Sequence, residues 1–535
     1  MYNRDRLVII LISIMLFRIP ISHIIGDNGC GYLSGPLEVF WCLSLLFGAG
    51  LTITLRGMMH DRVRRGQYSN ASQIFGLAKK YTFTAAIVLL IICTLSYDLI
   101  GTRLLHDTGS RIGFLFVGPA VFLALFINLN IGYLNGTDNN HAALIGEIVY
   151  AVAMGLGMIL GSIIGTHSGT AISALLKNEE VTAMYGAMGT MAGLCAGELI
   201  SLIVLMAMTI LYQRSFHHLM KSEAGRHREY ISDLSGRFIL GVLSDGLQEL
   251  ILHLPVFVSI ILYRSVNIRA EGADPAVIGS SVGAFYSKFI VITGILSLLG
   301  VSSVQGSLKG IAAAVNDSDT QAASDRISRL FARVSYYSIP AVIFTTMLAP
   351  VIVPTIYTGR LTNAVELLSS CTSLVFIYAL TYSFMSVLIK LGYNREMLVV
   401  SAAALVVSCV LGVFLIGKYE GKFTGPVIAM MVCYGLVMIV CVLILFRNFR
   451  MRFRLLQSFV IPLVVAGVIG VLIRLLGNAM YESVGGVITL LVCIIPAWFI
   501  YNLACMLLHV VSAGALNKKF LGPMLVRIGQ NLGVF

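Results

Sequence analysis

The chain has 535 residues, of which 58% are hydrophobic and only 12% are charged, and its mean hydropathy is +0.90. This composition excludes the soluble globular classes, and apolar runs of this length exclude a β-barrel, whose strands are short and alternating. The net charge of +12 fits basic loops on the cytoplasmic side of a membrane better than a nucleic-acid partner. We therefore predict an all-α polytopic membrane protein that binds no nucleic acid.

The apolar runs follow one another along the whole chain. Each has about the 20 residues that a helix needs to cross about 30 Å of hydrocarbon. An even number of spans that starts in the cytoplasm also ends there. We predict fourteen spans, at residues 7–25, 35–56, 81–101, 113–135, 141–165, 183–212, 237–263, 277–300, 335–357, 364–390, 397–417, 425–446, 456–476 and 485–511.

The first span carries an arginine and a proline. Arg18 keeps its charge, which costs about 2.5–3.5 kcal/mol at the centre of a bilayer on insertion scales. Pro20 removes a backbone donor, so we expect the helix to kink or end there. A charged, kinked first helix indicates a water-filled cavity that receives an anion.

The distribution of basic residues tests the orientation. The predicted cytoplasmic segments hold 25 of the 37 Lys and Arg residues, the outer loops hold 8, and 4 lie within spans. Cytoplasmic loops of membrane proteins carry such an excess of positive charge. We therefore predict that both termini are cytoplasmic.

Two landmarks indicate an internal repeat. Arg56-Gly57 recurs as Lys309-Gly310, and Gly136-Thr137-Asp138 recurs as Gly392-Tyr393-Asn394, at offsets of about 255 residues. Repeats of this kind place a substrate site between two halves near the bilayer midplane. We predict an N-lobe at 1–222 (spans 1–6), a C-lobe at 223–446 (spans 7–12), and spans 13 and 14 with a cytoplasmic tail at 447–535. We expect spans 13 and 14 to pack on something other than the two lobes.

The sequence carries no signature of an enzyme. It has no Walker lysine motif and no large polar loop with catalytic carboxylates. Its ten cysteines lie almost all in apolar runs without a CxxC pair, so we infer neither a disulfide framework nor a metal site. The glycine-rich segment 155–161 lies inside a span, where close helix packing is expected rather than a phosphate loop.

Several charged residues lie within or near the spans. Asp245, Glu249 and His253 follow one another at i, i+4 and i+8 and therefore share one helix face. Two interpretations stay open: cavity groups that bind a diphosphate or a coupling ion, or buried pairs, Lys288 with Glu249 and Arg18 with Glu38. Arg56 and Arg264 lie near span ends, where long side chains can reach the interface. The candidate substrate-binding residues are Arg18, Glu38, Arg56, Asp245, Glu249, Arg264 and Lys288.

The opening of the chain resembles a known family. Arg18-Ile19-Pro20 followed by Ile25-Gly26-Asp27-Asn28-Gly29-Cys30-Gly31-Tyr32 is similar to the pattern RIP…IGDEGxGLY of the polysaccharide-transporter and stage V sporulation protein B group. Gly48-Ala49-Gly50-Leu51 and Arg65-Gly66-Gln67-Tyr68 resemble the same group, whereas Thr52 and Arg56 depart from it. The group belongs to the multidrug/oligosaccharidyl-lipid/polysaccharide (MOP) exporter superfamily, with the MurJ-type lipid II flippases.

The resemblance implies a flippase for a polyprenyl-diphosphate-linked saccharide, driven by an ion gradient or the membrane potential. It also implies a groove for the lipid tail at spans 13 and 14. The alternative is a multidrug or cation antiporter of the same superfamily. We expect a monomer in the bacterial cytoplasmic membrane that needs no cofactor, with Na⁺ or H⁺ as the open choices for coupling. Its partners would be the lipid-linked saccharide and membrane lipids.

Overall fold

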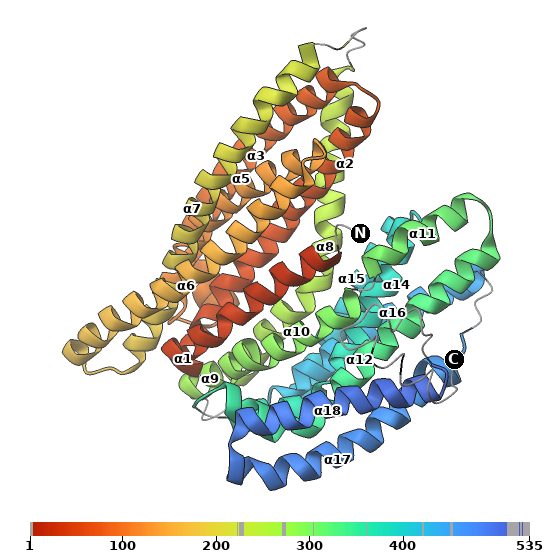
Figure 1. The fold of residues 1–535 in the computed structure, drawn as a ribbon. Coiled ribbons are helices and arrows are strands. Elements are labelled where there is room, and N and C mark those ends of the chain that lie inside the picture. Colours follow the sequence, from red (N-terminus) through yellow and green to blue (C-terminus); the bar gives the residue numbers. More distant parts are fainter. Residues whose placement is uncertain are drawn as a thin grey trace. The chain divides into compact units, whose positions relative to one another are not determined.

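The computed structural model describes residues 4–510 except 222, 224–228, 270–273, 303, 360, 420–421 and 450–452, together with residues 524 and 527. The described residues are helical almost throughout and form no strand, which confirms the all-α fold class (Figure 1). The elements, with π-helices written η, are α1 (Arg4–Leu43), η1 (Ser44–Ala49), α2 (Gly50–Arg64), α3 (Tyr68–Leu99), η2 (Ile100–Leu104), α4 (Arg111–Phe114), α5 (Val117–Gly136), α6 (Asn140–Leu176), α7 (Glu180–Lys221), α8 (Ile231–Asn267), α9 (Pro275–Ala284), η3 (Phe285–Phe289), α10 (Ile290–Val301), α11 (Val304–Asn316), α12 (Thr320–Ile356), α13 (Thr362–Cys371), α14 (Leu374–Lys390), α15 (Asn394–Lys418), α16 (Thr424–Phe449), η4 (Leu456–Val460), α17 (Ile461–Val484) and α18 (Gly486–Leu507).

The first helix breaks at Gly26, where φ is 68° and ψ is −177°. An L side chain rarely adopts this backbone conformation, whereas glycine does so without a steric penalty. The break turns the chain back on itself, because Phe17 from the first arm of α1 and Leu37 from the second line the same small cavity. The expected kink at Pro20 is wrong: the helix continues through Pro20, and the chain turns six residues later.

The break also decides how the spans are counted. Among the described residues, twelve helices are long and apolar enough to cross a membrane, or thirteen with the bent pair α13 and α14, whose axes differ by 52°. The first of these, Met15–Arg64, has 50 residues and would be about 75 Å long if straight. The break at Gly26 divides this stretch into two arms, in line with the predicted spans 7–25 and 35–56, so the count lies close to the predicted fourteen.

The structure divides into two compact units. The larger unit contains Ile12–Ser287 and Leu405–Pro426, and the smaller unit contains Met1–Leu11, Lys288–Ala404 and Val427–Phe535. Phe423 belongs to the larger unit because its ring stacks on Phe285, with the centroids 4.1 Å apart. The lobe boundaries that the repeat predicts stay a prediction.

Close helix packing in the larger unit depends on glycine. In α6 and α7, a Cβ atom on Gly161 would lie 2.1 Å from the carbonyl oxygen of Gly189, so the two backbones touch as expected for segment 155–161. The second arm of α1 approaches α9 in the same way. A Cβ on Gly31 would lie 2.2 Å from the carbonyl oxygen of Gly279, and one on Gly283 would lie 1.8 Å from that of Asp27. We call this α1–α9 contact the glycine seam.

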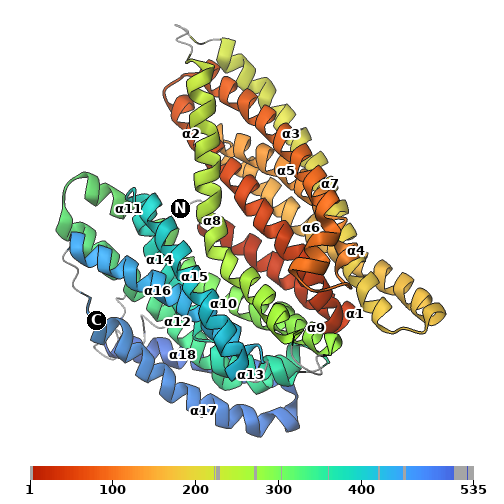
Figure 2. The ribbon, with the colours of Figure 1, turned by 180° about the vertical axis from the view of Figure 1, so that it is seen from behind.

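Helix α8 runs antiparallel to α2, as the view from behind shows (Figure 2). The helices are close because Gly246 of α8 faces the carbonyl oxygen of Leu46, and Gly50 of α2 faces that of Val242. A buried apolar core joins α8 to α2, α3, α5 and α7, with Leu51, Phe75, Leu205 and Phe238 among its members. This packing places the polar face of α8 against the second arm of α1 and α2.

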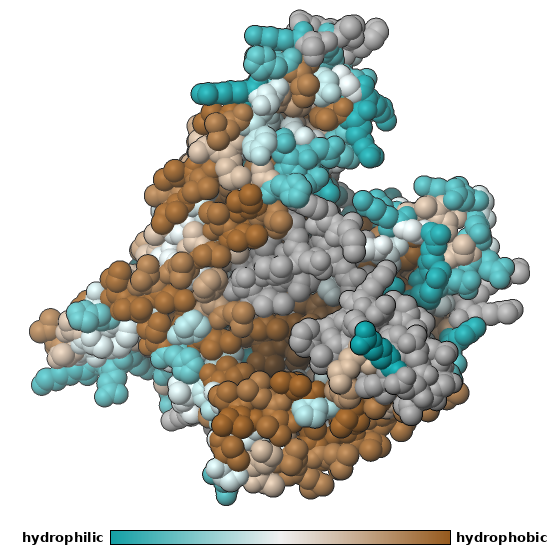
Figure 3. Space-filling view, viewed as in Figure 1, coloured by the Kyte–Doolittle hydropathy of each residue, from teal (hydrophilic) through white to brown (hydrophobic). Residues whose placement is uncertain are grey.

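In the smaller unit, α17 and α18 pack on α12. The Tyr336 hydroxyl of α12 donates to the side-chain oxygen of Asn502 in α18, and the Tyr501 hydroxyl donates to the Tyr336 carbonyl oxygen at 3.0 Å. Gly470 of α17 lies under the side chain of Ile343. The expectation that spans 13 and 14 need a partner outside the two lobes is wrong, because α12 lies within the predicted C-lobe. Their other faces are hydrophobic and exposed (Figure 3).

Candidate functional site

Arg18 lies in the first arm of α1 and is only 8% exposed. Its Nη2 donates a hydrogen bond to the hydroxyl of Tyr286 at 3.1 Å, and its guanidinium carbon lies 4.4 Å from the centre of the Tyr286 ring. Tyr286 comes from η3, 268 residues further along the chain. The tyrosine therefore meets the charge with both its ring face and its hydroxyl oxygen, an arrangement that stabilises a buried cation.

Glu38 lies in the second arm of α1 and is 1% exposed. Its Oε2 lies 2.8 Å from Nε2 of His253 on α8, and its carboxylate also accepts a hydrogen bond from the Tyr286 hydroxyl. Arg18 and Glu38 are thus joined through Tyr286 rather than merely neighbouring. Arg18, Glu38, His253 and Tyr286 form one connected network, which we call the Arg18 cluster.

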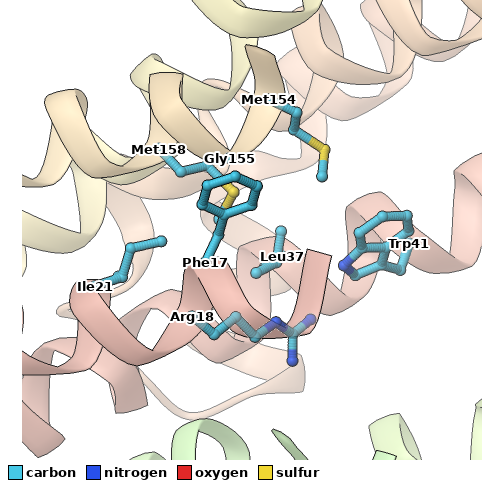
Figure 4. A pocket seen from close by; sticks show the side chains of 8 residues that line it. All are labelled: Phe17, Arg18, Ile21, Leu37, Trp41, Met154, Gly155 and Met158. Carbon is cyan, nitrogen blue, oxygen red and sulfur yellow. The ribbon is translucent and has the colours of Figure 1, made fainter. Parts of the chain in front are cut away.

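A small cavity lies beside the Arg18 cluster (Figure 4). Its volume is about 10 Å³, near the lower limit for a single water molecule. The two arms of α1 line it on one side and α6 on the other, through Phe17, Arg18, Ile21, Leu37, Trp41, Met154, Gly155 and Met158. In this conformation the first arm of α1 is therefore packed tightly against α6, and the cavity cannot hold a ligand of several atoms.

Two further acids continue the polar face of α8. Asp245 accepts a hydrogen bond from the Thr54 hydroxyl of α2 at 2.7 Å. Glu249 stands between Asp245 and His253, and all three side chains are half-buried. The predicted i, i+4, i+8 face is confirmed as a continuous polar strip about 12 Å long, and its two ends, Asp245 and His253, contact α2 and α1 respectively.

Arg264 belongs to a different contact. It lies eleven residues, or about 16 Å, beyond His253 on α8, and it is 4% exposed. Its Nη1 forms an ion pair with Asp107, which is also buried, and its Nη2 donates to the carbonyl oxygen of Gly31 at 2.8 Å. We call this ion pair and hydrogen bond the Arg264 clasp. The side chain is directed into the protein and does not reach outward from a span end.

The two remaining candidates are Arg56 and Lys288. Arg56 is exposed on α2. Lys288 is 1% exposed within the smaller unit, where its Nζ donates to the Thr358 carbonyl oxygen at 3.3 Å and lies 6.0 Å from the centre of the Tyr357 ring. The predicted meeting of Lys288 with Arg18 on one ligand stays a prediction.

Sequence reasoning missed three partners in this region. Tyr286 lies in an apolar run that contains no charged residue before Lys288. No local sequence pattern therefore identifies it as a site residue. Asp107 and Thr54 are likewise recognisable only through the residues that they meet in space. His253 was recognisable, because its spacing from Glu249 places it on the acidic face of α8.

No protein-family model matches the sequence, and no curated protein matches it. Solved structures do match this chain. An inward-facing multidrug resistance MATE family transporter of the MOP superfamily superposes with a TM-score of 0.62 at 13% identity, over 82% of this chain and 94% of that one. A lipid II flippase MurJ, in an inward closed conformation, gives 0.61 at 12% identity, over 94% and 98%. A MOP superfamily transporter from Pyrococcus furiosus gives 0.50 at 12% identity, over 83% and 95%.

The extent of the MurJ match bears on the last two helices. It leaves out 6% of this chain, or about 32 residues, whereas α17 and α18 have 24 and 22 residues. The superposition with MurJ therefore includes at least part of the segment that α17 and α18 form. Together, the helices, their span lengths and these superpositions show a multi-pass membrane protein with the fold that MATE transporters and MurJ share.

Proposed function

We propose that the chain is an alternating-access flippase that moves a polyprenyl-diphosphate-linked saccharide across the bacterial cytoplasmic membrane. On this proposal it is a member of the polysaccharide-transporter and stage V sporulation protein B group, monomeric, with both termini in the cytoplasm. The lipid-linked saccharide is its partner, and an ion gradient or the membrane potential drives the movement.

The observation that carries this proposal is the buried guanidinium of Arg18. A cation that cannot lose its proton is expensive inside a membrane, and it suits a ligand whose negative charge must cross. Tyr286 accepts one of its five N–H donors. A guanidinium binds phosphate oxygens in a bidentate fork, which an ammonium group does not reproduce. Arg56 and Lys288 are proposed as further ligands of the same diphosphate in other steps of the cycle.

A groove in the smaller unit supports a lipid-linked ligand. It has a volume of about 370 Å³ and lies between the end of α12 and α18. Apart from Thr355, only aliphatic side chains line it: Ile356, Val487, Leu490, Leu491, Ile494 and Ile495. Such a lining suits an alkyl or prenyl chain.

Filling the groove is expected to slow movement of long-chain substrates selectively. Leu491→Trp places a large ring in the groove, and we expect at least about a fivefold loss of transport for a long prenyl carrier, equivalent to about 1 kcal/mol of lost apolar contact. A short-chain analogue should be moved at the normal rate. Ile500→Trp, on the same helix with similar exposure and outside the groove lining, is the matched control. Equal loss for both chain lengths would show that the groove does not hold the tail.

A second candidate function is a cation antiporter. It is favoured by the acidic residues Asp245 and Glu249 on one face of α8, and by Glu38, which pairs with His253 on that same face. A MATE-type fold is compatible with it.

The deciding experiment reconstitutes the purified protein in liposomes. One assay follows a fluorescent polyprenyl-diphosphate sugar, and the other follows a cationic dye under an imposed ion gradient. The proposal expects movement of the first substrate and none of the second. Transport of the dye alone would replace the flippase with the antiporter.

A further inference from the structure

The pairing of Glu38 with His253 has a geometry that transport of a diphosphate does not require. The carboxylate is 1% exposed, whereas the imidazole side chain is 28% exposed, and the two atoms are 2.8 Å apart. Histidine is the side chain whose ordinary titration range lies nearest neutral pH. The pair therefore combines a buried hydrogen-bond acceptor, the Glu38 carboxylate, with a titratable imidazole that is partly exposed on the polar strip of α8.

The pair also joins the two predicted halves of the protein. Glu38 lies in the predicted N-lobe and His253 in the predicted C-lobe, both within the larger compact unit. If the halves separate during a transport cycle, this contact has to break. Its strength depends on the proton, because a protonated imidazole adds the Coulomb attraction of an ion pair to the hydrogen bond with the carboxylate, whereas a neutral imidazole does not.

The charged and titratable groups near the Glu38–His253 pair come from α1, η3 and α8. From α1, Arg18 stabilises the Glu38 carboxylate through Tyr286 of η3, and the Cys42 thiol lies near the same carboxylate. From α8 itself, the carboxyl groups of Glu249 and Asp245 share the face of His253. Lys288 also belongs to η3 but is described within the smaller unit.

We propose that Glu38 and His253 form the proton-binding site that couples this protein to a proton gradient. The inference rests on the proposed alternating-access function and names its coupling ion. With the proton on His253, an imidazolium–carboxylate pair holds α1 to α8. Loss of that proton to water leaves a neutral imidazole against the carboxylate, weakens the contact and favours separation of the halves. No covalent bond forms or breaks, and one proton is bound and released.

A spin-label distance measurement tests the proposal without any substrate. The labels are placed at Glu179 and Arg269, exposed positions in the predicted N-lobe and C-lobe respectively, after replacement of the ten cysteines. The distance distribution is recorded between pH 5.5 and 8.5. We expect the longer-distance population to grow as the pH rises, by about fivefold relative to the shorter one, which corresponds to about 1 kcal/mol of lost attraction between the two groups.

Three variants identify the group responsible. His253→Gln and Glu38→Gln should each remove the pH dependence. His60→Gln is the matched control, because His60 also pairs with a carboxylate, Asp138 at 3.1 Å, but within the predicted N-lobe. It should keep the wild-type profile. If His253→Gln does not fold, His253→Asn and Glu38→Gln carry the same test.

The outcomes separate this inference from the proposed function. A wild-type distribution that does not change with pH, or an unchanged profile in the His253 and Glu38 variants, would overturn the proton site. A pH-dependent distribution that these variants abolish supports it, even if the liposome assay finds no lipid-linked substrate. In that case the proposed function fails and the proton site stands.

Discussion

Replacing Arg18 by alanine is expected to abolish transport in the liposome assay while the protein still folds and inserts. The substitution removes the charge that would contact the diphosphate, together with a charged hydrogen bond to Tyr286 at 3.1 Å. Hydrogen bonds to charged groups contribute about 1.5–3 kcal/mol each, so losing both bonds of a bidentate fork to the diphosphate corresponds to a loss of at least about 100-fold in rate. Arg18→Lys keeps the charge without the planar fork, so we expect it to be partly active.

The variants of its partners distinguish a ligand from a structural contact. If Arg18 only balances Glu38, then Arg18→Ala combined with Glu38→Gln should regain transport at matched expression, because no buried carboxylate is left alone. If Arg18 binds the substrate, the double variant stays inactive. Tyr286→Phe keeps the ring under the guanidinium and removes only the hydroxyl that joins Arg18 to Glu38. It should therefore retain more activity than Arg18→Ala.

Replacing Arg264 by alanine is expected to destabilise the protein more than any other single change to a candidate site residue. The side chains of Arg264 and Asp107 are both 5% exposed, so the substitution leaves a carboxylate buried without its cation. Breaking a buried pair in this way costs about 3–5 kcal/mol. In detergent, we expect a lower unfolding temperature and faster loss of the monodisperse peak on size-exclusion chromatography.

A matched pair of variants checks this interpretation. Arg269 lies two residues beyond the end of α8 and is exposed, so the unfolding temperature of Arg269→Ala should not change. Arg264→Gln with Asp107→Asn removes both charges together and should recover most of the lost stability. If Arg264→Ala unfolds at the wild-type temperature, the clasp contributes little to the folded state.

The positions of the spans were predictable, because insertion of an apolar segment into a membrane depends mainly on its own length and hydrophobicity. The partners of the charged residues were not predictable in this way. Tyr286 stands 268 residues from Arg18, and His253 stands 215 residues from Glu38. The charge of Arg18 within a span marked it as a site residue, and the spacing of Asp245, Glu249 and His253 placed them on one face through helical periodicity, but neither pattern identifies a partner on another helix. The predicted first span, 7–25, ends next to the turn at Gly26, but the helix continues through Pro20, since proline is tolerated in a membrane helix whose neighbours satisfy the backbone.

The glycine seam has a consequence for how quickly this part of the molecule can rearrange. At Gly31, Gly279 and Gly283 the backbones of α1 and α9 meet without an intervening side chain. Association of ordinary surfaces immobilises side chains at about 0.5–1.5 kcal/mol each, a cost that glycine does not incur. No side-chain rotamers have to be ordered before the two surfaces fit, and no side chains interlock after they have met. The glycine seam can therefore form and break repeatedly at little cost in conformational entropy. The neighbouring Arg264 clasp stabilises the contact once it has formed.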